Sequence, residues 1–158
     1  GIGSCAEYSV DGTEKRGLST ELKSDTLYGS TKIIAYFLSK KIYEEKSGNF
    51  CWLRLFYVYE HGLRNDKIHG IIERSVENNN PIEIKRPKDI LDFIHVRDAI
   101  LLISKHVRGS SSGAHNVCTG SGQKISTLAQ TYAKRLGFSG EIVCSEQTSK
   151  PLKIIGDL

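Results

Sequence analysis

The chain has 158 residues, the length of one ordinary globular domain, with 39% hydrophobic and 25% charged residues. The net charge is +4, but the lysines and arginines are scattered, so no nucleic-acid partner is expected. No apolar run approaches the roughly 20 residues of a membrane span, and no membrane partner is expected either. The chain opens without a signal-peptide pattern and contains no methionine. We therefore expect a fragment whose natural start lies upstream.

Residues 1–8 have the pattern of a strand end followed by a turn, and 9–27 that of a long polar loop. Apolar residues then recur at helical spacing from residue 27 to about 45, which predicts a helix with one buried stripe. The stripe would consist of Ile33, Ile34, Phe37, Leu38 and Ile42. Residues 50–59 are aromatic and almost continuously apolar, which predicts a strand buried on both faces.

The second half continues the alternation of helices and strands. Helices are predicted over 66–78, 97–107 and a segment that ends at Gly137, with Ser126 or Thr127 as its N-cap. Strands are predicted over 82–84, 90–96, 115–118 and 141–145, and the tail 146–158 is left undecided. This alternation predicts an α/β fold with a mostly parallel sheet.

The four cysteines are Cys5, Cys51, Cys118 and Cys144, and none are spaced as a C-x-x-C pair. Three of them lie in apolar, strand-like runs, so we expect buried free thiols in a reducing, cytoplasmic compartment. The five histidines form no closely spaced ligand pair. No metal site is expected from the sequence.

The most informative spacing is a tyrosine four residues before a lysine, Tyr28 and Lys32, at the start of the first predicted helix. Residues four apart lie on the same face of a helix, so the Lys32 ammonium can approach the phenol. A nearby cation lowers the pKa of a phenol and makes it a usable proton shuttle. Ser4, at the preceding strand end, could hydrogen-bond a reacting oxygen. The alternative is a solvated lysine beside a half-buried tyrosine.

Several segments occur together in a characteristic order: Gly-Ser-Cys-Ala-Glu-Tyr at 3–8, Tyr-Gly-Ser-Thr-Lys at 28–32 and Leu-Arg-Leu-Phe-Tyr-Val-Tyr at 53–59. Asp-Phe-Ile-His-Val-Arg-Asp-Ala at 92–99 and His-Asn-Val-Cys-Thr-Gly at 115–120 follow. Together they resemble the C-terminal part of an extended short-chain dehydrogenase/reductase of the NAD-dependent epimerase/dehydratase family, which acts on nucleotide sugars. The resemblance covers nearly the whole chain.

The resemblance implies the C-terminal part of a Rossmann-like parallel sheet with a smaller α/β substrate-binding portion. Residues 1–64 would belong to the NAD(P)-binding domain and 65–158 mainly to the substrate-binding portion, with 90–107 returning to the Rossmann sheet. Family dimers imply a homodimer through the helix that carries the tyrosine and lysine. The cofactor would be NAD or NADP, and the partner a nucleotide-sugar substrate.

The same resemblance implies catalytic roles for Ser4, Tyr28 and Lys32, with Tyr28 as general acid/base. Tyr28, Lys32 and Phe56 would contact the cofactor. The substrate-binding residues would be Cys5, Ala6, Tyr57 and Arg64.

Four departures from the family pattern narrow this expectation. The glycine-rich turn that binds the cofactor pyrophosphate is absent from the 158 residues. Cys5 and Ala6 stand where dehydratases carry an acidic pair, and Glu7 could replace that pair only with a shifted turn. Tyr57 stands where many members have asparagine. Leu91 replaces a phosphate-binding arginine, for which Arg54, Arg64 and Arg86 are the alternatives.

The expected function is therefore an NAD(P)-dependent nucleotide-sugar epimerase or 4-keto-reductase. A dehydratase of the same family remains an alternative, and so does a non-catalytic fragment or binding module that lacks the cofactor-binding half.

Overall fold

The computed structural model describes residues 1–10, 15–62 and 67–158. Its elements follow one another as β1 (Ile2–Ser4), the 3-10 helix η1 (Cys5–Glu7), α1 (Leu27–Glu45), β2 (Cys51–Leu55), β3 (Tyr57–Tyr59), α2 (Ile68–Glu77), β4 (Ile82–Ile84), β5 (Ile90–Leu91), β6 (Phe93–His95), α3 (Val96–Arg108), β7 (Gly113–Val117), β8 (Gln123–Lys124), α4 (Ile125–Arg135), β9 (Ile142–Cys144) and β10 (Lys153–Ile154).

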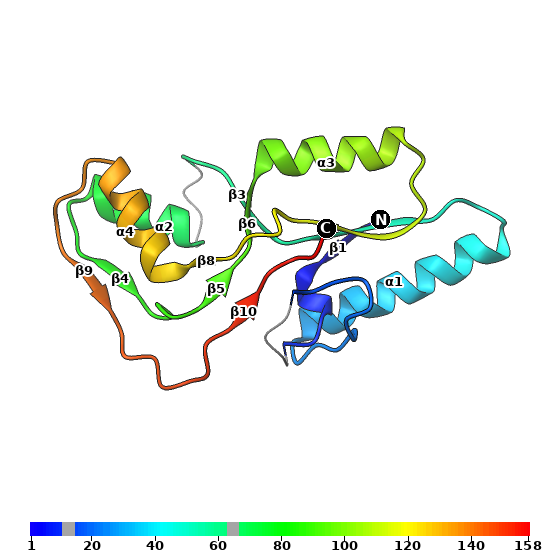
Figure 1. Cartoon of the computed structure of the whole chain (residues 1–158), viewed down its shortest axis with the longest axis horizontal. Coiled ribbons are helices and arrows are strands. Elements are labelled where there is room, and N and C mark those ends of the chain that lie inside the picture. Colours follow the sequence, from blue (N-terminus) through cyan, green and yellow to red (C-terminus); the bar gives the residue numbers. More distant parts are fainter. Residues whose placement is uncertain (11–14, 63–66) are drawn as a thin grey trace.

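A parallel sheet in the order β1-β2-β7 lies between α1 and α3 in one half of the molecule, and both termini lie close to it (Figure 1). Successive side chains of β2 point to opposite faces of this sheet. Trp52 and Arg54 face α1, where both lie against the ring of Tyr36. Leu53 faces the other way and belongs to the core under α3, together with Ile94, Ala99 and Val117. The two helices therefore cover opposite faces of one sheet.

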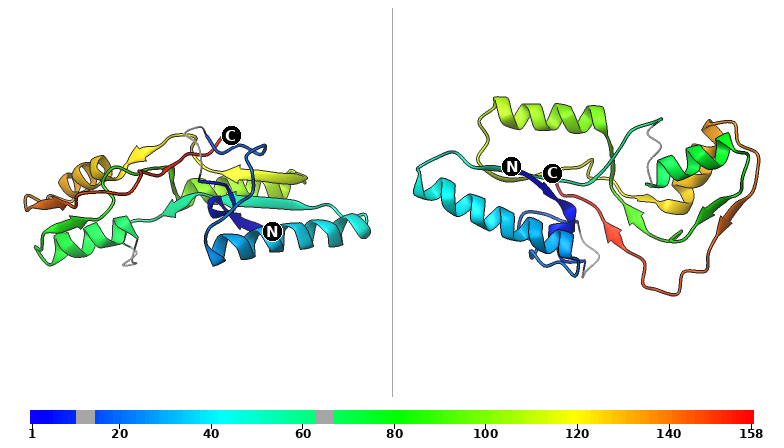
Figure 2. Two further views of the ribbon diagram at one scale, coloured as in Figure 1. Left: turned by 90° about the horizontal axis from the view of Figure 1, so that it is seen from below. Right: turned by 180° about the vertical axis from the view of Figure 1, so that it is seen from behind.

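A second group of elements lies at the other end of the molecule, as Figure 2 shows from two further directions. There α2 and α4 pack on the parallel pair of β4 and β9. The buried residues of this core are Ile72, Ile82, Ile84, Ile125, Ala129, Tyr132 and Ala133. The short parallel pair of β3 and β6 and the sheet β10-β5-β8 join the two ends.

Two predicted strands are each divided into two in the structure, for the same reason. Between β2 and β3, the Phe56 amide still donates to Val117 of β7, while the Tyr57 amide donates to Asp92. The chain thus leaves one partner strand and joins another at this point. Between β5 and β6, the Asp92 amide donates to Ile154. Each division is a change of strand partner, which a run of apolar letters does not reveal.

The fold class is confirmed as α/β with parallel strand pairs, and α1 has the predicted bounds. The predicted N-caps of α4 are wrong, because the helix starts at Ile125 and Ser126 lies within its first turn. Lys124 is the N-cap and makes no side-chain capping bond. Carbonyls of a distant turn before β5 accept from the helix N-terminus instead: the Ile125 amide donates to Asp89 and the Ser126 amide to Pro87.

The predicted buried stripe of α1 is also wrong among the described residues. Ile34, Phe37 and Leu38 are 63%, 54% and 60% exposed, and only Gly29 of this helix is buried. The described elements reach α1 mainly through Tyr36 and the first turn, so they leave the rest of the stripe uncovered.

The thiol prediction holds in part. All four cysteines are free, and Cys5 and Cys118 are buried, but Cys51 is only half-buried and Cys144 is exposed. The helices that the structure describes include none that is both long enough and apolar enough to span a membrane.

Candidate functional site

The strand end at Ser4 is fixed by a reciprocal capping box. The Ser4 Oγ accepts a hydrogen bond of 3.2 Å from the Ala6 amide, and the Ser4 amide donates to Glu7 Oε1 at 2.8 Å. These bonds satisfy backbone donors at the start of η1 and turn the chain sharply away from β1. Ser4 is therefore held at the carboxyl end of a parallel strand, where sites in this class of sheet form.

Helix α1 begins directly against this turn. Thr26 is its N-cap, and its Oγ1 accepts from the Gly29 amide at 3.1 Å. Gly29 is buried, and a β-carbon there would collide with the Ala6 carbonyl oxygen and the Ser24 side chain. Glycine thus allows the helix and the turn to meet backbone to backbone.

Tyr28 and Lys32 occupy the first two turns of this helix. The Lys32 Nζ lies 5.9 Å from the centre of the Tyr28 ring and donates to the Ile2 carbonyl of β1 at 3.0 Å. Tyr28 is 57% exposed, so its phenol is accessible. The structure therefore brings together the three predicted catalytic residues: the exposed phenol, the ammonium and the strand end that carries Ser4.

The predicted substrate and cofactor contacts lie beside this strand end but are less accessible. Cys5 and Phe56 are buried in one cluster, and Tyr57 packs against that cluster. Burial raises the pKa of the Cys5 thiol to about 12 and also raises the pKa of Tyr57. Both groups are therefore neutral at physiological pH. Ala6 is half-buried in the turn.

The three arginines proposed to contact a substrate anion lie in different environments. Arg54 is 2% exposed and paired with Glu7, so the prediction that it reaches a substrate anion is wrong. Arg86 is hydrogen-bonded to Asp89, Ser149 and the Lys150 carbonyl. The predicted substrate-binding residue Arg64 lies outside the described residues.

The sequence analysis missed a buried polar network beneath the site. Glu7 is completely buried and pairs with Arg54 through a contact of 2.6 Å between Oε2 and Nε. The Arg54 guanidinium also donates to the Tyr8 hydroxyl, which donates in turn to Asn116 of β7. The sequence signal for this network was Arg54 within the apolar run 50–59. A charged residue is seldom buried without a partner, so a buried acidic partner could have been expected.

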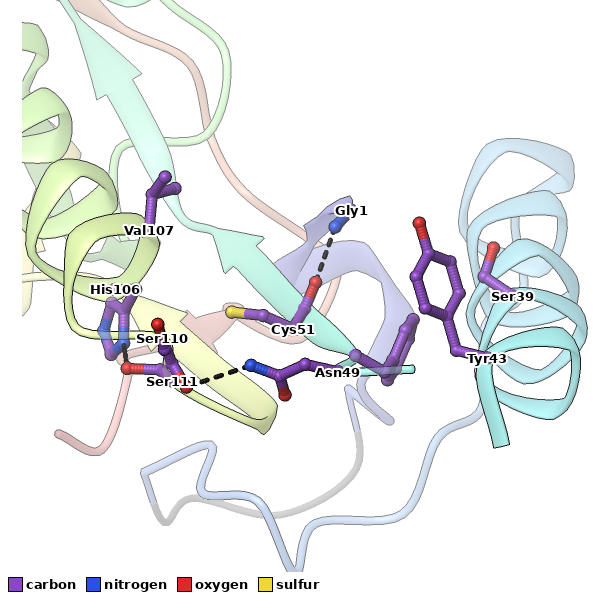
Figure 3. A pocket seen from close by; sticks show the side chains of 10 residues that line it. Gly1, Ser39, Tyr43, Asn49, Cys51, His106, Val107, Ser110 and Ser111 are labelled. Carbon is purple, nitrogen blue, oxygen red and sulfur yellow. Dashed lines mark hydrogen bonds between the residues drawn. The ribbon is translucent and has the colours of Figure 1, made fainter. Parts of the chain in front are cut away.

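Two cavities of the described structure lie away from this site. One of about 450 Å³ is lined by Ser39, Tyr43, Cys51, His106 and Val107, among others (Figure 3). Its Tyr43 lies about 22 Å along α1 from Tyr28 at the usual rise per residue. The second, of about 400 Å³, lies between α2 and α4. The described residues contain no cluster of three or more His, Cys, Asp or Glu arranged to hold a metal ion.

A parallel sheet flanked by helices, with a tyrosine–lysine pair beside a strand end, defines a Rossmann-like α/β chain. The model of the NAD dependent epimerase/dehydratase family matches residues 2–118. The chain belongs to that family. A search of curated proteins finds no match.

Solved structures confirm the fold at low sequence identity. A point mutant of UDP-glucuronic acid 4-epimerase from Bacillus cereus matches with a TM-score of 0.86 at 16% identity, covering 99% of this chain and 51% of that one. UDP-N-acetylglucosamine 4-epimerase from Methanobrevibacter ruminantium M1 gives 0.84 at 16%, covering 99% and 53%. RMD from Pseudomonas aeruginosa, complexed with NADPH, gives 0.84 at 18%, covering 99% and 56%. The chain spans about half the length of each.

Proposed function

We propose that this chain forms the catalytic-helix and substrate-binding part of an NAD(P)-dependent nucleotide-sugar epimerase or 4-keto-reductase. The observation that carries the proposal is the placement of Lys32 within 5.9 Å of the Tyr28 ring and against strand β1, which ends at Ser4. Family membership and the structural similarity to UDP-sugar epimerases support it.

The residues present fit the nicotinamide end of NAD or NADP. Lysine has three N–H donors, and the bond to Ile2 uses one, which leaves donors for ribose hydroxyls. Tyr28 presents an exposed phenol one turn earlier, and Phe56 is proposed to line the cofactor side. Solved relatives that carry NAD or NADPH support this choice of cofactor. When bound, the nicotinamide supplies hydride transfer.

The chain's own residues would handle the proton and the reacting oxygen. Tyr28 takes the proton from a sugar hydroxyl, or returns it to a keto oxygen, as the carbon is oxidised or reduced. The Lys32 ammonium stabilises the phenolate electrostatically. The Ser4 hydroxyl hydrogen-bonds the sugar oxygen and fixes its distance from the phenol.

The position of Glu7 disfavours the dehydratase alternative. Dehydration requires an acid that can reach the leaving hydroxyl group. Glu7 is completely buried, and its carboxylate is occupied by Ser4, Trp52 and Arg54. Cys5 cannot replace it, because burial raises the pKa of its thiol to about 12.

The substrate is proposed to be a nucleotide sugar, with Cys5, Ala6, Tyr57 and Arg64 on its side of the site. We place residues 1–64 in the cofactor-binding domain and 65–158 mainly in the substrate-binding portion, with 90–107 returning to the sheet. The exposed apolar face of α1 supports a homodimer through this helix. The free cysteines support a reducing, cytoplasmic location.

The proposal is tested with the full-length natural protein that contains this chain. Purified protein would be incubated with UDP-glucose, UDP-N-acetylglucosamine and UDP-glucuronic acid, and the C4 configuration of the sugars followed by NMR. A 4-keto nucleotide sugar with NADH or NADPH tests the reductase form. Epimerisation or reduction would support the proposal. Release of water to form a 4-keto-6-deoxy sugar would instead identify a dehydratase, and the absence of both turnover and cofactor binding would indicate a non-catalytic module.

A further inference from the structure

The ion pair between Glu7 and Arg54 is buried beside the candidate site, and burying it costs free energy. Both side chains are almost completely removed from solvent, at 0% and 2% exposure. Taking two charges out of water is expensive, and a well-packed apolar pair of similar volume is often as stable or more stable. Burial acts to lower the pKa of the Arg54 guanidinium, but its interactions with Glu7 and Tyr8 together outweigh burial, and the pKa is raised. The Arg54 guanidinium therefore remains charged.

Glu7 connects this pair to Ser4. Its Oε1 accepts from the Ser4 amide at 2.8 Å, which closes the capping box described above. The same carboxylate accepts from the Trp52 indole nitrogen at 3.1 Å. Trp52 and Arg54 of β2 both donate hydrogen bonds to the Glu7 carboxylate. The turn that carries Ser4 therefore has little freedom to rotate relative to the sheet.

Arg54 connects the pair to the catalytic helix. The carbon of its guanidinium lies 4.8 Å from the ring centre of Tyr36 and 5.0 Å from that of Tyr8. Tyr36 is one helical turn after Lys32 and two turns after Tyr28, on the same face of α1. Among the described residues the Arg54 Nη2 has no hydrogen-bond partner, and the two tyrosine rings stabilise the guanidinium by cation–π contacts.

We propose that Glu7 and Arg54 are positioning residues that set the distance between Ser4 and the Tyr28–Lys32 pair. Glu7 holds the turn, Arg54 holds the helix through Tyr36, and their ion pair fixes one to the other. Neither residue touches substrate. This inference rests on the proposed function of the Ser4, Tyr28 and Lys32 site.

The test separates positioning from stability. In the full-length natural protein, kcat, KM and the melting temperature would be measured for Glu7→Gln, Arg54→Met and the double variant. Glutamine keeps an acceptor for Ser4 and Trp52, and the double variant leaves no unpaired buried charge. We expect the double variant to melt within a few degrees of the natural protein but to lose roughly ten- to hundredfold in kcat, with KM little changed, because small misplacements of reacting groups have effects of this size.

Tyr36→Leu provides a second variant that leaves the ion pair intact. It should lower kcat several-fold, and this result decides the question if the double variant fails to fold. Ile103→Ala is the matched control, because it removes apolar packing under α3, on the face of the sheet opposite the ion pair. It should lower the melting temperature and leave kcat unchanged.

A readout independent of turnover is also available. Trp52 is the only tryptophan in the 158 residues, so its indole N–H NMR signal reports directly on Glu7. That signal should shift in Arg54→Met and stay unchanged in Ile103→Ala. If both positioning variants retain natural kcat, or if kcat falls only in proportion to melting temperature, the inference fails. Tyr28→Phe, measured in parallel, tests the proposed function separately from the positioning role. Unchanged turnover in that variant would overturn the proposed function itself.

Discussion

Gly29 of helix α1 and the carbonyl of Ala6 are so close that no side chain can stand between them. This contact brings the helix that carries Tyr28 against the turn that carries Ser4. Replacing Gly29 by alanine should therefore separate the two segments and destabilise the fold by about 1–3 kcal/mol, the usual range for overpacking. Thr31→Ala, at an exposed position two residues later, is the control. Chemical denaturation measures both, and equal stability of Gly29→Ala and the natural chain would contradict the contact.

A second prediction concerns His69, which stacks on Tyr59 with ring centres 4.1 Å apart. Burial, and then the nearby His61, lower the pKa of His69 from 6.5 to about 4. The folded state therefore resists a proton that the unfolded state accepts below about pH 6.5. Stability should be complete above that pH and fall by on the order of 3 kcal/mol as the pH drops towards 4.

His69→Phe should remove most of this dependence, because phenylalanine can keep the stack and does not titrate. Within the part of the chain that the structure describes, the His69 Nδ1 has no hydrogen-bond partner to lose. Urea denaturation at a series of pH values between 4 and 7 measures the slope for both proteins. An unchanged acid slope in His69→Phe would show that another group causes it.

A third prediction concerns Asp92, which ties the junction of β5 and β6 to two distant segments. Its carboxylate accepts hydrogen bonds from the amide and hydroxyl of Thr119 and from the amides of Gly120 and Gly156. Asp92→Asn replaces one acceptor oxygen by a donor and should cost about 2–4 kcal/mol in urea denaturation. Asp98→Asn, at an exposed position in α3, should change stability by less than about 1 kcal/mol.

A fourth prediction addresses the proposed homodimer. Ile34 and Leu38 lie one turn apart on the exposed face of α1. If this face is the interface, changing both to glutamate should convert a dimer into a monomer in sedimentation velocity experiments. Lys40→Glu, at an exposed position away from the face that carries Ile34 and Leu38, should leave the dimer intact. If the natural protein is monomeric at micromolar concentration, the proposed homodimer is contradicted.

Local sequence patterns predicted the elements better than they predicted their partners. The helical spacing after residue 27 predicted α1 with its observed bounds, and the helices predicted over 66–78 and 97–107 correspond to α2 and α3. The divisions at Phe56 and Asp92 were not predictable, because each depends on a carbonyl from a distant segment. The exposed stripe of α1 was misjudged for a related reason: spacing identifies an apolar face but not whether anything covers it.

The candidate site shows the same limit. The spacing of Tyr28 and Lys32 predicted their proximity, and the order of motifs placed Ser4 at the adjoining strand end. The partnership of Glu7 with Arg54 joins residues 47 positions apart, so no local pattern contains it. The strand register, which pairs Ser4 with Leu55, brings the turn that carries Glu7 beside the strand that carries Arg54.

The central claim is that Tyr28 is the acid/base group of a nucleotide-sugar enzyme. The most direct measurement compares turnover of UDP-sugars and of a 4-keto nucleotide sugar by the full-length natural protein and its Tyr28→Phe variant, with cofactor content and melting temperature recorded for both. Positioned acid–base groups typically contribute about 10²–10⁴-fold. We predict a loss of turnover of about that size with an unchanged fold and retained cofactor, whereas turnover within a few-fold of the natural protein would contradict the account.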